Sequence, residues 1–163
     1  MPGDQLAYEP IGTIRSPFDS PDGMPIQPAG ANAIEGIVEV DESYAGGLKD
    51  LDGFSHCILL YHFHAAAEGA SLRVEPFLDD EERGVFATRA PRRPNPIGIS
   101  IVEIEDVTAR TVLVNGIDVV DGTPLLDIKP FVPAFDVPER AKTGWLDASL
   151  STIAMKRSDD RFL

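Results

Sequence analysis

The chain has 163 residues, 43% of them hydrophobic, which suits one compact domain with a core large enough to fold unaided. Its formal net charge of −13 excludes a protein that coats nucleic acid through a general excess of cations. The longest apolar run, near Cys57 to Tyr61, is far shorter than the ~20 residues of a membrane span, and no signal peptide precedes it. We therefore expect a cytoplasmic protein that has no membrane partner.

The first third of the chain carries two strand patterns and a long loop. Residues 7–15 and 34–40 alternate β-branched with polar side chains, which is the period of a half-buried strand. The proline- and glycine-rich residues 16–32 between them predict a structured loop. Residues 42–51 favour a short helix, and Asp52–Gly53 then predicts a turn.

The clearest strand pattern covers residues 54–64. Alternation puts all three histidines of the chain on one face, and it puts these residues on the other: Cys57, Leu59, Tyr61 and Phe63. Because His56 and His62 would stand roughly 20 Å apart at ~3.3 Å per residue, they cannot share a zinc ion. The single cysteine excludes a CxxC site and an internal disulfide, so we expect a buried structural thiol and no metal.

The rest of the chain predicts more strands and few helices. Strand patterns and one turn fall at these positions: 84–88, 97–105, 111–119 and 125–131, with the turn at 121–124. Strands do not alternate with long helices, so we expect a mainly β protein, a single small barrel of mostly antiparallel strands with short helices and long loops. Residues 1–148 would form this barrel domain and 149–163 a C-terminal tail.

The chain lacks the GxGxxG, P-loop, HExxH and GxSxG motifs, so its polar loops are the candidate sites. Three arginines lie among prolines between residues 87 and 100: Arg89, Arg92 and Arg93. Arg89 suits a carboxylate or a ribose hydroxyl, and Asn95, held between two prolines, suits a ligand edge. Gly98 would let a ligand approach the backbone closely. The other two arginines fit either a ligand contact or a solvated turn.

Four motifs, in this order, resemble the TsaA-like (TrmO) family of tRNA adenine-N6 methyltransferases: IGTIRSPF at 11–18, DGFSH at 52–56, TRAPRRPNPIGIS at 88–100 and DGTPLLDIKPF at 121–131. The resemblance spans roughly residues 11–136. It implies a small non-Rossmann barrel that binds S-adenosylmethionine at a homodimer interface. It also implies methyl transfer to N6 of the threonylcarbamoylated adenosine just 3′ of the anticodon of tRNA.

The resemblance further implies a set of cofactor contacts in this chain: Pro25, Ile26, Gln27, His64, Ala65, Arg89, Ile99, Val120, Asp121, Gly122 and Thr123. The family often has polar side chains where this chain has Ile26 and Ala65, which leaves backbone contacts at those two positions. His64 gains support from the match, whereas His62 fits either a pocket wall or the core.

Methyl transfer from a sulfonium is an in-line displacement, so the enzyme needs positioning and an acceptor for the N6 proton. Asp121, Asp127 and Asp136 are candidate acceptors. A structural turn is the alternative for Asp121, and an ion pair with Lys129 is the alternative for Asp127. We assign no catalytic residue.

Two other functions remain open. One is a non-catalytic module that binds S-adenosylmethionine or another nucleoside, and the other is a methyltransferase for a different RNA or a small molecule. Some members of the family carry an extra C-terminal domain, for which this chain leaves little room. RNA would then contact the barrel and a patch that spans the dimer.

Overall fold

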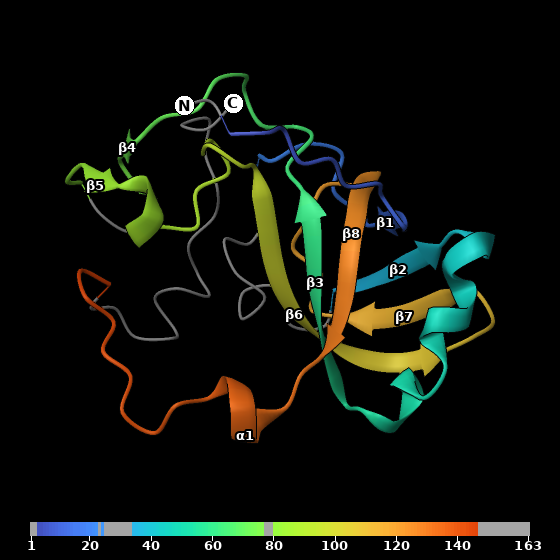
Figure 1. Cartoon of the computed structure of the whole chain (residues 1–163). Coiled ribbons are helices and arrows are strands. Elements are labelled where there is room, and N and C mark those ends of the chain that lie inside the picture. Colours follow the sequence, from blue (N-terminus) through green and yellow to red (C-terminus); the bar gives the residue numbers. More distant parts are fainter. Residues whose placement is uncertain (1–2, 23, 25–33, 77–79, 147–163) are drawn as a thin grey trace.

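The computed structural model describes residues 3–22, 24, 34–76 and 80–146. Six strands close into an antiparallel barrel in the order β1-β2-β7-β6-β3-β8 (Figure 1). Their bounds are β1 Gly12–Arg15, β2 Glu35–Val40, β3 His56–His62, β6 Ile97–Val107, β7 Thr111–Asn115 and β8 Thr123–Pro130. The predicted fold class, a mainly β antiparallel barrel with short helices, is confirmed.

The remaining elements are short and lie outside the barrel. They are the two-stranded ribbon β4 (Arg73–Val74) and β5 (Arg83–Gly84), the 3-10 helices η2 (Glu42–Leu48), η3 (Leu51–Gly53) and η4 (Val85–Ala87), and the helix α1 (Pro133–Asp136). Figure 1 shows the ribbon on one side and the helices between β2 and β3 on the opposite side. In the described part of the chain, no helix is both long and apolar enough to cross a membrane.

Several predicted elements have different bounds. The first strand is only Gly12–Arg15, because Pro10 has no N–H to donate to a neighbour. The strand predicted at 84–88 was wrong beyond Gly84: the chain turns into η4, where the Thr88 N–H donates to the Val85 carbonyl (3.0 Å). Asp50, in the left-handed region with φ 70°, divides the predicted helix 42–51 into η2 and η3.

The strands near the C-terminal end of the barrel were also predicted with shifted bounds. The strand predicted at 111–119 ends at Asn115, because Gly116 takes a φ of 94° that breaks the extended backbone. β8 begins at Thr123, directly after Gly122 with a φ of 82°, two residues before its predicted start. The predicted tail 149–163 lies outside the described residues, so the proposed domain boundary stays a prediction.

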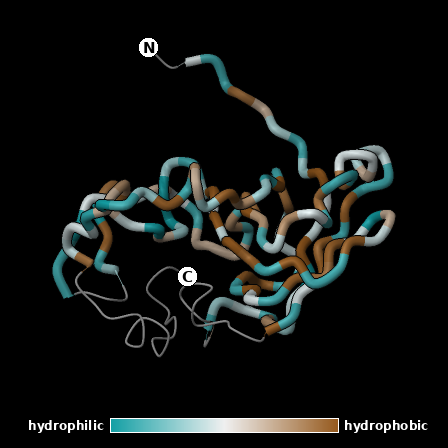
Figure 2. The backbone as a smooth tube through the Cα atoms, turned by 90° about the horizontal axis from the view of Figure 1, so that it is seen from below, coloured by the Kyte–Doolittle hydropathy of each residue, from teal (hydrophilic) through white to brown (hydrophobic). Residues whose placement is uncertain are grey.

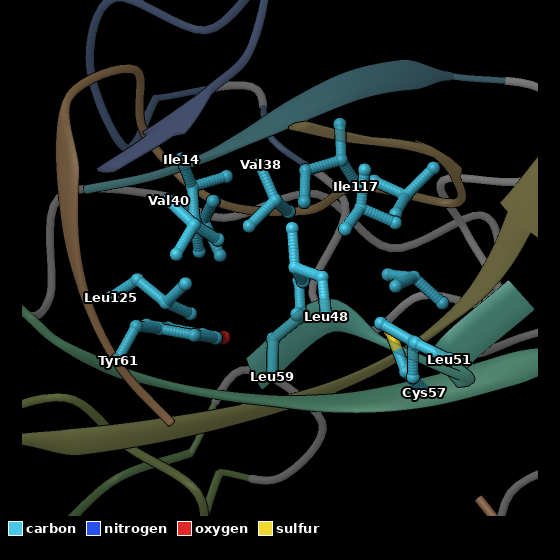
Figure 3. Packing of buried hydrophobic residues seen from close by; sticks show 14 residues of the cluster. Ile14, Val38, Val40, Leu48, Leu51, Cys57, Leu59, Tyr61, Ile117 and Leu125 are labelled. Carbon is cyan, nitrogen blue, oxygen red and sulfur yellow. The ribbon is translucent and has the colours of Figure 1, made fainter. Parts of the chain in front are cut away.

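Alternation along the strands fills the barrel with aliphatic side chains. On β3 the buried residues are Cys57, Leu59 and Tyr61, which share one face as predicted. Figure 3 shows them beside the other inward residues, with the Tyr61 ring next to Leu125 and its hydroxyl turned into the barrel. Burying each large aliphatic side chain stabilises the fold by about 1.5–3 kcal/mol. Figure 2 shows hydrophobic stretches on the barrel strands and the N-terminal segment extending away from them.

The buried thiol of Cys57 matches the prediction of a structural cysteine. Cys57 is 0% exposed and forms no disulfide. Burial raises the pKa of its thiol to about 12, so the group stays neutral and unreactive at physiological pH.

Candidate cofactor site

The strand register brings four polar segments to one end of the barrel. They are the loop after β1, the turn after β3, the loop before β6 and the turn before β8. His62 at the end of β3 pairs with Ile97 at the start of β6, and Tyr61 pairs with Leu125 near the start of β8. The Phe63 N–H donates to the Pro96 carbonyl (2.8 Å), which joins the turn after β3 to the loop before β6. The predicted contacts His64, Ala65, Ile99 and Val120–Thr123 lie on these segments.

The first and last family motifs are bound to each other at this end. Asp121 Oδ1 accepts from the Ser16 N–H (3.0 Å), and the Ser16 hydroxyl donates to the Val119 carbonyl (2.5 Å). The Asp121 N–H donates to the Phe18 carbonyl (2.8 Å). Asp121 therefore holds the loop after β1 against the turn before β8. This favours the structural alternative for Asp121, although its carboxylate bonds the Ser16 backbone rather than its own turn.

The turn Val120–Thr123 is stabilised by the side chain of Thr123 and by the backbone conformation of Gly122. The Thr123 hydroxyl donates to the Val120 carbonyl (2.6 Å). Gly122 takes a φ of 82°, a conformation that L side chains rarely adopt. The turn thus has a fixed backbone at the end of the barrel, which suits the recognition of a ligand by backbone groups.

Two of the three arginines in the proline-rich loop brace the loop itself. Arg93 Nη1 donates to the carbonyls of Thr88 (2.8 Å) and Ala90 (3.1 Å), and Arg92 Nε donates to the Gly69 carbonyl (3.1 Å). Both side chains are partly buried. The structure therefore supports neither a purely solvated turn nor a free cationic patch for these two arginines.

Arg89 differs from these two arginines because its charge acts on groups inside the barrel. It lowers the pKa values of Asp118 and Tyr61, against the larger effect of their burial. The guanidinium of Arg89 is therefore within electrostatic range of both, while the residue itself is exposed. Asn95 is exposed in the same loop, and its backbone carbonyl accepts from the Ile97 N–H (2.7 Å).

The prediction that a ligand approaches the backbone at Gly98 was wrong. A Cβ atom at this position would stand 2.3 Å from Cε2 of Tyr61 and 2.7 Å from Cζ of Phe63. The two rings pack edge to face, with centroids 5.6 Å apart, over the glycine. Gly98 is therefore required by the packing of two aromatic side chains, and they occupy the space that was predicted for a ligand.

The histidines lie on the outer face of β3, and the strand ends before the third. His56 bonds Ser55 through Nδ1 (2.7 Å) and packs edge to face on Phe131, with centroids 6.2 Å apart. His62 is exposed rather than in the core. The strand was predicted to reach His64, but that residue lies in a turn where its N–H bonds the His62 carbonyl (2.9 Å). Across the described residues, no three His, Cys, Asp or Glu side chains are grouped as metal ligands.

The other two candidate proton acceptors have structural partners away from this end. Asp127 forms the predicted ion pair with Lys129 (2.9 Å), which raises the pKa of the lysine through their hydrogen bond. Asp136 Oδ2 accepts from the Val132 N–H (2.8 Å) at the start of α1. Asp127 lies in the same row of the sheet as the predicted contact Ile99, with Leu60 of β3 between them.

A buried polar cluster behind the site was missed by the sequence analysis. The Tyr61 hydroxyl bonds the Ser100 hydroxyl (2.8 Å), which donates to Asp118 Oδ1 (2.5 Å), and all three residues are buried. Burial raises the pKa of Asp118 to about 7, against the opposing effects of the Ser100 hydrogen bond, a bond from its own backbone and Arg89. The sequence feature that could have indicated this buried carboxylate is the position of Asp118 between two apolar residues, Ile117 and Val119.

A cavity of about 360 Å³ lies elsewhere on the barrel. It is lined by η2, η3 and the second half of β8, including Leu48, Phe54 and Pro130. None of the predicted cofactor contacts in the described residues lines it. Three of those contacts, Pro25, Ile26 and Gln27, lie outside the described residues.

The donors at the end of the barrel that carries Arg89 and the Val120–Thr123 turn fit the chemistry of S-adenosylmethionine. Arg89 offers a guanidinium for a carboxylate, the Val120–Thr123 turn offers fixed backbone groups, and Ile99 offers an apolar surface that is 38% exposed. The arrangement defines a closed antiparallel β-barrel with a candidate polar site in the loops at one end.

The chain belongs to the tRNA-methyltransferase O family. The model of that family's N-terminal domain, described as "tRNA-methyltransferase O N-terminal domain", matches residues 13–137. The resemblance inferred from the four motifs is thereby confirmed.

Known relatives and solved structures agree with this assignment. A probable S-adenosyl-L-methionine-binding protein of Pyrococcus abyssi is 50% identical over 157 residues, which is 96% of this chain and 85% of that protein. The tRNA (adenine(37)-N6)-methyltransferase of Escherichia coli is 37% identical over 77% of this chain, which spans 57% of that enzyme. The crystal structure of TrmO from Pseudomonas aeruginosa superposes with a TM-score of 0.74 at 39% identity, covering 88% of this chain and 63% of that one.

Proposed function

We propose that this chain transfers a methyl group from S-adenosylmethionine to N6 of the adenosine next to the tRNA anticodon, in its threonylcarbamoylated form. The observation that carries the proposal is the binding of the first and last family motifs to each other at the end of the barrel that also holds Arg89. The name of the Escherichia coli relative supports adenine N6 as the acceptor. A tRNA substrate also favours the cytoplasm, as we predicted.

The residues of this chain would act mainly by positioning. S-adenosylmethionine supplies an electrophilic methyl group on a sulfonium. The guanidinium of Arg89 would hold an anionic group of the cofactor, and the Val120–Thr123 turn would orient its nucleoside through backbone groups. Because Asp121, Asp127 and Asp136 are engaged in structural bonds, none of them is proposed as the acceptor of the N6 proton.

We also propose that the chain acts as a homodimer through an aliphatic strip on the outer face of β3 and β6. The strip consists of Ile58, Leu60, Ile97, Ile99 and Ile101, which the register places side by side. Its three β6 members are 38–45% exposed. Exposed apolar side chains grouped on one sheet face are typical of a protein interface. Since Ile99 is also a predicted cofactor contact, a partner bound here would complete the site from its own loops.

A second candidate function is the binding of S-adenosylmethionine without methyl transfer. The acidic surface favours it, since the net charge is −13 and two arginines of the basic loop are bonded within the protein. The name of the Pyrococcus abyssi relative mentions only binding. Transfer to another RNA or to a small molecule is the third candidate.

One assay separates these functions. The purified chain is incubated with methyl-labelled S-adenosylmethionine and with tRNA that either carries or lacks the threonylcarbamoyl group, and nucleosides are identified by mass spectrometry. The proposal predicts labelled N6-methyl groups on the threonylcarbamoylated adenosine alone. Label on an unmodified adenosine would correct the substrate, and cofactor binding without any label would favour the binding module.

A further inference from the structure

The buried cluster formed by Tyr61, Ser100 and Asp118 connects the segments that carry the predicted cofactor contacts. Tyr61 precedes the turn with His64 by three residues, Ser100 follows Ile99 directly, and Asp118 lies two residues before Val120. The cluster therefore ties the ends of β3 and β6 to the loop between β7 and β8 through side chains.

A cluster that contains a carboxylate is energetically unfavourable in a hydrophobic core. Tyr61 is 4% exposed, Ser100 1% and Asp118 8%. Burying a carboxylate carries a large desolvation penalty, and apolar side chains of similar volume are often at least as stabilising. The Ser100 hydroxyl and the charge of Arg89 offset only part of this penalty, since burial still dominates at Asp118. Stability alone is therefore a weak reason for a carboxylate here.

The buried carboxylate of Asp118 interacts electrostatically with Arg89. Asp118 is a buried acidic group whose pKa the charge of Arg89 lowers, and Arg89 is itself a predicted cofactor contact. A buried negative charge attracts an exposed guanidinium toward the end of the barrel and limits the orientations it adopts.

We propose that Asp118, held by Ser100 and Tyr61, is a positioning residue that fixes Arg89 and the Val120–Thr123 turn in the geometry that binds S-adenosylmethionine. This inference rests on the proposed function. Asp118 touches no reacting atom in the proposal. It acts through Arg89 and through the backbone of its own loop.

The proposal predicts how cofactor affinity depends on pH. The groups that act on the Asp118 carboxyl are the Ser100 hydroxyl from β6, the backbone of Asp118 itself and the Arg89 guanidinium from the loop before β6. The Asp118 charge in turn raises the pKa of the Tyr61 hydroxyl from β3. Burial keeps Tyr61 neutral by raising its pKa, so Asp118 is the group in the cluster that titrates near pH 7. Its ionised form positions Arg89, so affinity should rise as pH increases through about 7.

The same ionisation has the opposite effect on stability. The pKa of Asp118 is raised by folding from 3.8 to about 7, so ionisation costs more in the folded than in the unfolded chain. The free energy of unfolding from this group therefore falls as pH rises between these values. Asp118→Asn cannot ionise, so it should be more stable than the native chain at pH 8, by at least about 2 °C in Tm, and should keep only a smaller part of this advantage at pH 5.

Calorimetric titration of S-adenosylmethionine into four proteins tests the proposal at pH 6, 7 and 8. They are the native chain, Asp118→Asn, Ser100→Ala and Asp106→Asn, the last being an exposed aspartate on β6 and the matched control. We expect Asp118→Asn to bind about tenfold more weakly at pH 8, with a flat pH profile, because one charge-assisted interaction is lost. Ser100→Ala should weaken binding in the same direction, and Asp106→Asn should behave as the native chain.

A double-mutant cycle with Arg89→Ala separates positioning from a general loss of structure. If Asp118 acts through Arg89, then Asp118→Asn should cost little further affinity in a chain that already lacks Arg89. Native affinity and native pH dependence in Asp118→Asn, or fully additive losses in the cycle, would overturn the proposal while leaving the proposed function intact. A native chain that binds no S-adenosylmethionine at any pH would overturn both.

Discussion

Gly98→Ala should destabilise the barrel and disturb the cofactor site together. The new methyl group would stand 2.3 Å from the Tyr61 ring and 2.7 Å from the Phe63 ring, and both distances are far below van der Waals contact. The Tyr61 ring is held in place, because Tyr61 is 4% exposed and its hydroxyl bonds Ser100. The rings must therefore shift, or the strand pair β3–β6 must open.

The expected cost follows from the overpacking of well-packed cores. Adding a methylene-sized group to such a core costs typically about 1–3 kcal/mol. For a chain of this size, each kcal/mol corresponds to about 2–4 °C in Tm. We thus expect Gly98→Ala to lower the free energy of unfolding by about 1–3 kcal/mol. A shift of Tyr61 would also strain its bond to Ser100 and weaken the affinity for S-adenosylmethionine.

Urea denaturation followed by circular dichroism measures this change, and Gly53→Ala is the matched control. A Cβ atom at Gly53 would meet no heavy atom within 4 Å, so this change should alter the free energy of unfolding by less than about 0.5 kcal/mol. Equal stability of Gly98→Ala and the native chain would refute the packing of two aromatic rings over Gly98.

Three further predictions concern the site, the assembly and the core. Arg89→Ala should weaken the binding of S-adenosylmethionine by about 1–3 kcal/mol in calorimetry, whereas Arg110→Ala, at the β6–β7 turn, should leave it unchanged; equal affinities would remove Arg89 from the site. Ile101→Asp should convert the dimer to a monomer in analytical ultracentrifugation, while Ile37→Asp, on the outer face of β2 and 42% exposed, should not; a native monomer would exclude the proposed interface. Cys57 should react with a thiol reagent only when the barrel unfolds, because burial raises its pKa to about 12; rapid reaction of the folded chain would contradict its burial.

Local patterns were sufficient to predict most of the barrel wall. The alternation along residues 54–64 put Cys57, Leu59 and Tyr61 on one face, which the structure shows to be the inner one, because the side-chain period of a strand depends only on neighbours in sequence. Strand ends were predicted less well, since they depend on particular backbone angles. β7 ends just before Gly116 and β8 begins just after Gly122, and both glycines have positive φ values. The sequence shows the two glycines but not their backbone angles.

The features that define the candidate site depend on contacts between distant residues. Tyr61 and Ser100 are 39 residues apart, and Ser100 and Asp118 are 18 apart, so no local pattern joins them. Gly98 was assigned to ligand approach because its use in packing depends on the ring of Tyr61 from another strand. The family resemblance assigned contacts to segments that are far apart in sequence, and the register brings those in the described residues to one end of the barrel.

A crystal structure of the chain bound to S-adenosylmethionine tests the central claim most directly. We expect the cofactor at the end of the barrel formed by Arg89 and the Val120–Thr123 turn, with the loops of a second copy, bound at the aliphatic strip, completing the site near Ile99. A cofactor bound instead in the cavity beside Leu48 and Phe54 would contradict the account, and so would a site formed by one copy of the chain alone.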